Sequence, residues 1–272
     1  MLRFARVLEV TALSIFATGL LSAQWLTYPT PGIPRLPNGK ANLKAPAPRT
    51  ADGKPDFSGL WLQEHDRPCA PGGCQDFQAS EQFWDMGYGM PGGLPYQPWA
   101  AKIVKERTES NGLEDPDTTC VPQGIIKAHT VDLLRKMIQL PGLIVILNER
   151  NAAYRQIFTD GRPLPADMLP TYNGYSTGHW EGDTLVVQSA GFRDQMWLDR
   201  NGSPVSDAAK ITEKFRRLDF GTLEVEVTVD DPKVYTKPWT TKLRQIFQPD
   251  TDMIDYICLE NEKDIPHLFE KK

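Results

Sequence analysis

The chain has few of the residues and motifs on which common enzyme sites depend. It contains four histidines and four cysteines in 272 residues. It has no Gly-x-Ser-x-Gly turn, no glycine-rich phosphate loop ahead of a helix, and no His-Glu-x-x-His pair. These absences argue against the common serine hydrolases, nucleotide-dependent enzymes and zincin proteases. His65, His129 and His179 could meet in a zinc site, but no pair of them has ligand spacing, so we predict no metal and no cofactor.

The sequence also lacks a basic excess and, beyond its start, a long apolar run. The formal net charge is -5, whereas nucleic-acid binding needs a basic surface, so we predict no nucleic-acid partner. No stretch after residue 24 approaches ~18 consecutive apolar residues, so we expect no membrane span once a signal is removed. The 23 prolines and 21 glycines favour short strands and turns over long helices.

The first 24 residues have the pattern of a cleavable secretory signal. Arg3 and Arg6 precede a short apolar stretch that ends at Ser22-Ala23-Gln24. This stretch is too short to span a bilayer, although a retained anchor is the alternative. We therefore predict a signal peptide at residues 1–23 and a periplasmic or secreted location.

Four cysteines in an exported chain predict two disulfides, for which three pairings are possible. Cys69 and Cys74 bracket the turn-forming sequence Ala-Pro-Gly-Gly and should close a local loop. That leaves Cys120 to pair with Cys258, which would tie an early loop to the last expected strand. The alternative for Cys69 and Cys74 is half of a metal site.

Proline content separates an extended lead-in from the main domain. Residues 24–56 hold seven prolines, which disfavour helix and central-strand pairing, so we expect an extended arm or linker there. Residues 57–272 should form one barrel domain. Residues 98–110 are the best helix candidate, because Trp99, Ile103 and Val104 can share one face.

From residue 133 onward, short apolar runs alternate with turns. The clearest period of two lies at 223–229, where Leu and Val alternate with Glu and Thr. No strand–helix rhythm indicates a parallel sheet. We predict a mainly β fold, an antiparallel lipocalin- or calycin-like barrel of nine or ten strands with one short helix; a two-sheet sandwich is the alternative. The expected strands lie at 57–62, 136–140, 143–149, 153–158, 175–180, 184–189, 211–218, 223–229, 239–248 and 253–259.

Two resemblances accompany this pattern. Gly59-Leu60-Trp61 resembles the Gly-x-Trp signature of lipocalins, which implies that the Trp plugs one end of the barrel. Several longer segments resemble an uncharacterised family of secreted bacterial proteins, which implies membership but no catalytic residues. Those segments are APRTADGKPDFSGLW (47–61), YRQIFTDGR (154–162), WEGDTLVV (180–187) and VDDP (229–232).

Arg155 is the first candidate site residue. On a strand, Tyr154, Gln156 and Phe158 should face one way and Arg155 the other. A buried arginine needs a carboxylate or an anionic ligand. Arg155 is therefore either half of a structural ion pair or a clamp for a ligand carboxylate or phenolate. Its possible partners are Glu149, Asp199 and Glu213.

His179 is a candidate general base. It precedes the turn at 181–183 and should lie near a barrel rim, with Asp183 or Tyr175 in support. In this interpretation Arg155 stabilises negative charge and Glu149 is a further buried carboxylate. The alternative is a rim histidine bonded to backbone.

The long connection at 193–200 adds Trp197 and Asp199, which suit a flat, partly polar ligand. A loop simply pinned by Trp197 is the alternative. The predicted ligand-binding residues are Tyr154, Gln156, Tyr175, Trp197, Asp199 and Glu213.

The aromatic content favours a barrel that binds a small apolar, aromatic molecule. One alternative is a cofactor-independent lyase, isomerase or hydrolase that uses the barrel cavity. The other is an envelope interaction protein with a filled barrel.

Overall fold

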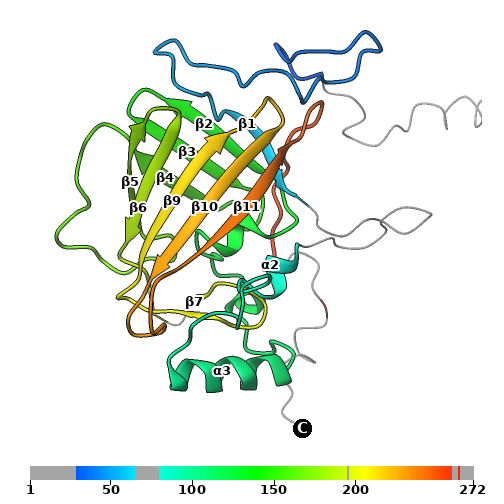
Figure 1. Cartoon of the computed structure of the whole chain (residues 1–272). Coiled ribbons are helices and arrows are strands. Elements are labelled where there is room, and N and C mark those ends of the chain that lie inside the picture. Colours follow the sequence, from blue (N-terminus) through cyan, green and yellow to red (C-terminus); the bar gives the residue numbers. More distant parts are fainter. Residues whose placement is uncertain (1–28, 65–79, 195, 259–262, 264–272) are drawn as a thin grey trace, which may run out of the picture.

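Nine strands close into one barrel, in the order β1-β11-β10-β9-β6-β5-β4-β3-β2. The structure, a computed structural model, describes residues 29–64, 80–194, 196–258 and 263. The expected mainly β, lipocalin-like barrel is confirmed (Figure 1). The barrel strands are β1 (Gly59–Gln63), β2 (Arg135–Leu140), β3 (Leu143–Asn148), β4 (Tyr154–Phe158), β5 (Tyr175–Glu181), β6 (Thr184–Ala190), β9 (Lys210–Arg217), β10 (Thr222–Asp230) and β11 (Trp239–Phe247).

The β4–β5 junction departs from the antiparallel prediction, because these two strands run parallel. Only Ile157 with Ser176 and Phe158 with Thr177 are in register there. Residues 159–174 leave the end of β4, cross back along the outside of the barrel and enter β5 in the same direction (Figure 1). A crossover of this kind is what parallel pairing requires.

The prediction of a strand at 253–259 is wrong for residues 253–258, the part that the structure describes. Only Tyr256 forms an isolated bridge, to Arg150. Both edges of β11 are already paired with β1 and β10, so the closed barrel offers no free edge for a further strand. Residues 251–258 instead run past Glu149, which accepts the N–H of Ile254 at 3.0 Å.

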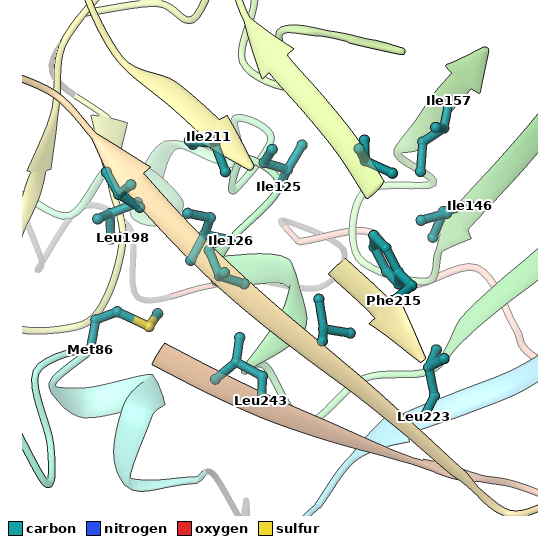
Figure 2. Packing of buried hydrophobic residues seen from close by; sticks show 14 of the residues in the cluster. Met86, Ile125, Ile126, Ile146, Ile157, Leu198, Ile211, Phe215, Leu223 and Leu243 are labelled. Atoms are coloured by element: carbon teal, nitrogen blue, oxygen red, sulfur yellow. The ribbon is translucent and has the colours of Figure 1, made fainter. Parts of the chain in front are cut away.

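The barrel interior follows the period of two. On β10, Leu223, Val225, Val227 and Val229 are fully buried, while the residues between them are at least partly exposed. Figure 2 shows Ile146, Ile157 and Phe215 together with residues from outside the barrel strands, among them Ile125 and Ile126. The core therefore continues from the barrel into the segment that precedes β2.

The remaining elements are short and gather at one end of the barrel (Figure 1). The predicted helix is present as α3 (Pro98–Glu109), but it buries Ala100 rather than Trp99, which is half exposed. The other elements are α2 (Glu81–Trp84), η1 (Pro116–Thr119), η2 (Lys127–His129), β7 (Met196–Trp197) and β8 (Pro204–Val205).

The opposite end is covered by the proline-rich arm, of which the structure describes residues 29–56 (Figure 1). Its cations pair with carboxylates that follow β11 or lie in the turns at that end. These ion pairs are Arg35–Asp250 at 2.5 Å, Lys44–Asp219 at 3.0 Å and Arg49–Asp183 at 2.6 Å.

Trp61, the tryptophan of the Gly-Leu-Trp sequence at the start of β1, packs inside the barrel. Its indole is fully buried, donates to the carbonyl of Phe57 at 2.9 Å and packs edge-on against Phe247. The guanidinium of Arg217 lies 4.9 Å from the indole centroid. Gly59 has φ +129°, and a Cβ there would lie 2.3 Å from the Phe247 ring, so the motif needs glycine at this position.

The predicted bridge between Cys120 and Cys258 is confirmed, with a Cα–Cα distance of 5.6 Å. It ties the region around η1 to the tail after β11, rather than to a strand. Cys69, Cys74 and the predicted signal peptide lie outside the described residues. In the part of the chain that the structure describes, no helix has the length and apolarity to cross a membrane.

Candidate functional site

Arg155 points into the barrel, where Glu213 on β9 is its partner. The Nη1 group donates to Oε1 at 3.0 Å, and Nη2 bonds Oε2. Nε donates to Ser176 Oγ at 3.1 Å, and Nη2 also donates to Ser189 Oγ at 3.0 Å. These bonds use all but one of the N–H groups of the guanidinium. Arg155 is therefore part of a structural ion pair, and only one of its N–H groups is left for a ligand.

His129 is the second partner of Glu213, with Nε2 at 2.8 Å from Oε1. On its other side, Arg135 Nη1 donates to Nδ1 at 2.7 Å. Because arginine can only donate, Nδ1 accepts and Nε2 carries the proton, so the imidazole is neutral. Burial and the nearby charge of Arg135 lower the pKa of His129 to about 4. The sequence suggests only a possible metal-ligand role for His129, because no strand pattern surrounds this residue.

These four side chains, His129, Arg135, Arg155 and Glu213, form a buried charge network across the barrel. Burial would raise the pKa of Glu213, but Arg155 and His129 outweigh it and lower the pKa to about 2. Burial lowers the pKa of Arg135 to about 9, and its guanidinium bonds Gln245 on β11. The network and the apolar core both consist of buried side chains.

A cleft of about 690 Å³ lies outside the barrel, over the β4–β5 junction. We call it the seam cleft. The two strands are in register over only two residue pairs, so they diverge towards Tyr154 and Gly174. Asn173 spans the divergent end, where its Nδ2 donates to the carbonyl of Tyr154 at 3.0 Å. The lining residues are 122, 151–156, 158, 162, 163, 165 and 171–177.

The seam cleft is walled by aromatic and polar side chains. Tyr154 is 63% exposed, and Phe158, Tyr172 and Tyr175 are partly exposed. The guanidinium of Arg162 lies 4.0 Å from the Phe158 centroid. Exposed ring faces and edges of this kind can stack on a flat ligand, and tyrosine adds a hydroxyl for hydrogen bonding.

A second, smaller hollow of about 280 Å³ adjoins the seam cleft and shares Pro122 and Tyr172 with it. We call it the mouth pocket. Lys127, almost fully buried, lies in its wall with Nζ at 2.8 Å from Asp115 and 2.7 Å from Asp117. These three charges in the wall are therefore paired with one another. The other lining residues are 116, 119, 121, 123, 193, 194, 196 and 197.

Three of the predicted ligand-binding residues meet in one place. Tyr154, Gln156 and Tyr175 all line the seam cleft. Trp197 lines the mouth pocket instead, with the guanidinium of Arg107 at 4.6 Å from its ring. The alternation of residues along β4 and the position of the turn before β5 made it possible to predict Tyr154, Gln156 and Tyr175 from the sequence.

The other two predicted ligand-binding residues are buried away from both hollows. Glu213 lies inside the barrel. Asp199 accepts the N–H of Met86 at 2.8 Å and two bonds from Ser203, and burial raises its pKa to about 6. Asp199 therefore pins the loops around β7 and β8 rather than facing a cavity.

The residues predicted for catalysis do not converge. The His179 side chain is 60% exposed on the outside of β5, with Nε2 at 3.1 Å from Glu181. Asp183, one of its two expected supports, pairs with Arg49 of the arm at 2.6 Å. Glu149 is buried and accepts backbone N–H groups of the segment before β2 and of the tail.

No family model and no curated protein sequence matches this chain. The resemblance to a family of secreted bacterial proteins therefore stays a prediction.

Proposed function

We propose that the protein binds a small, flat aromatic molecule in the seam cleft. The observation that carries the proposal is a hollow of about 690 Å³ walled by Tyr154, Phe158, Tyr172 and Tyr175. Small-ligand sites typically have volumes of ~300–1,000 Å³, with mostly apolar walls and a few polar groups. Gln156 and Asn173 supply polar groups here.

The buried charge network that crosses the barrel supports a ligand outside rather than inside it. The buried charge network is internally hydrogen-bonded, and displacing Arg155 or Glu213 would leave its buried partner charge without its ion pair. Beneath the cleft, Arg155 and Ser176 belong to this fixed floor. A rigid floor under an aromatic wall gives a preformed site, which reduces the entropy cost of binding.

Binding fits this cleft better than acid–base turnover. Its described lining contains no histidine, carboxylate, lysine or cysteine side chain. Side chains of those types are the ones that most often transfer protons in acid–base catalysis. The catalytic alternatives therefore have no observation in their favour here.

We also propose that the protein works in the periplasm or outside the cell. The Cys120–Cys258 disulfide supports this location, since disulfides persist in oxidising compartments, and so does the pattern of residues 1–23. Fractionation of cells that express the full chain, with mass analysis of its N-terminus, tests the location.

Isothermal titration calorimetry with indole-3-acetamide, a neutral flat aromatic probe, tests the binding proposal. Tyr154→Ala and Tyr175→Ala should each weaken binding by about fivefold, because each removes about 1 kcal/mol of ring contact. Tyr88→Ala is the matched control, since Tyr88 is 53% exposed but lines neither hollow. Equal affinity of all three variants, or no heat with the unmodified protein, contradicts the proposal.

A further inference from the structure

We infer that the ligand of the seam cleft is an aromatic acid whose carboxylate pairs with Arg193. This inference rests on the proposed function and names the ligand's chemical class. The carrying feature is the exposed Arg193 in the wall of the mouth pocket, whose guanidinium lies beside Tyr172, a residue that lines both hollows.

Arg193 differs from the other cations that line the two hollows. Arg155 is held by Glu213, Arg162 by Asp160 at 2.6 Å, and Lys127 by two aspartates. Arg193 lines the mouth pocket, and no carboxylate among the described residues lies in ion-pair contact with it. It is therefore the lining cation with its charge available.

Arg193 is also fixed beside the cleft. Its guanidinium lies 5.1 Å from the ring centroid of Tyr172, which lines both hollows. Its backbone N–H donates to the carbonyl of Thr171 at 2.8 Å, and the N–H of Thr171 donates to Gly191 at 3.0 Å. These bonds hold the residues around Tyr172 and Arg193 together before any ligand arrives.

A guanidinium stacked on a ring keeps its N–H groups free at its edge. That edge is the part that binds a carboxylate through two parallel hydrogen bonds. A ligand ring in the seam cleft beside Tyr172 would therefore direct an acidic substituent past that ring to Arg193.

The carboxylates that line the mouth pocket do not cancel the attraction of Arg193 for an anionic ligand group. Asp115 is neutralised by Lys127 and by Arg200 at 2.6 Å, and Asp117 is paired with Lys127. Asp194 is exposed, and its charge helps raise the pKa of Lys233. The remaining cation next to Tyr172 is Arg193.

Three indole probes of equal ring size test the inference by calorimetry at low salt. These are indole-3-acetate, neutral indole-3-acetamide and cationic tryptamine. The acetate should bind about fivefold more tightly than the amide, as expected for a partly exposed charged hydrogen bond. Arg193→Gln should abolish that difference and leave amide binding unchanged, while Arg193→Lys keeps part of it. Arg162→Gln is the matched control and should keep the full difference, because Arg162 is already paired with Asp160.

The outcomes separate the inference from the proposed function. If acetate and amide bind equally, or tryptamine binds best, the inference fails while the aromatic site stands. If Arg162→Gln removes the difference and Arg193→Gln does not, the carboxylate lies elsewhere and the assignment to Arg193 fails. If none of the three probes binds, both proposals fail.

Discussion

At the scale of single residues, the pKa values of two buried side chains, His129 and Asp199, are shifted in opposite directions. His129 is held neutral, since its pKa is lowered from 6.5 to about 4. The unfolded chain takes up that proton between about pH 6.5 and 4 while the folded chain does not, so stability falls as the pH falls through this window. Asp199 has its pKa raised from 3.8 to about 6. It keeps a proton that the unfolded chain has lost, so stability falls as the pH rises through about 3.8 to 6.

Between pH 4 and 6 these two effects largely offset each other. Asp199→Asn removes one of them, so the variant should lose stability more steeply than the parent as the pH falls from 6 to 4. The difference in slope should approach about 1.4 kcal/mol per pH unit, the value for one proton. Urea unfolding at several pH values measures it.

Asp207→Asn is the control for this profile, because Asp207 is exposed and pairs with Lys233 at the surface. Its pH profile should follow that of the parent. Parallel profiles for the Asp199 variant and the parent would show that Asp199 does not titrate in this range.

Part of this residue-level arrangement could be predicted from sequence. The period of two placed Arg155 opposite Tyr154 and Gln156, and the structure bears that out. The choice of Glu213 over Glu149 or Asp199 could not be predicted, because it depends on which strands the closed barrel brings face to face. His129 comes from a single turn of 3-10 helix, which has no repeat for a pattern to reveal.

At the scale of elements, the seam cleft depends on how residues 159–174 return to β5. Gly174 ends this crossover with φ +60°. A Cβ there would lie 2.7 Å from the carbonyl oxygen of Ala190 and 2.8 Å from the Phe192 ring. The wall of the cleft therefore needs glycine for both its backbone conformation and its close contact.

Gly174→Ala should destabilise the protein by about 1–3 kcal/mol and weaken indole-3-acetamide binding, because strain and overlap displace the neighbouring Tyr172 and Tyr175. Chemical denaturation and calorimetry measure the two effects. Gly161→Ala is the control, since Gly161 has φ +89° but nothing within 4 Å of its Cβ position. Gly161→Ala should have a similar backbone strain but lose less affinity for indole-3-acetamide. Equal losses of affinity in the two variants would contradict a role for the Gly174 region in forming the cleft.

Strand positions were largely predictable, whereas the direction of β5 was not. Alternating apolar residues and glycine turns located the barrel strands to within about two residues. Direction depends on where the crossover at 159–174 leads, and this segment has neither a repeat nor regular structure to indicate it. β7 and β8 span only two residues each, too few for any period to be visible.

At the scale of the whole molecule, the disulfide joins parts that the barrel strands do not connect. Cys120 lies in the region that forms the mouth pocket, and Cys258 lies in the tail after β11, 138 residues later. A bridge that closes so long a loop restricts the unfolded chain strongly.

The double variant Cys120→Ser, Cys258→Ser should lose about 2–5 kcal/mol of unfolding free energy. It should also bind indole-3-acetate more weakly, because Thr119, Val121 and Pro122, next to the bridge, line the hollows. Denaturation and calorimetry on the oxidised parent and the double variant provide the comparison. Unchanged unfolding would mean that the tail is held by its other contacts, such as those to Glu149.

The position of the seam cleft, away from the Trp61 end of the barrel, has a kinetic consequence for the proposed ligand. A guest in the seam cleft can enter and leave without any strand separating, because the hollow lies on the outer surface. We expect rapid exchange, with entry governed by diffusion and orientation rather than by gating.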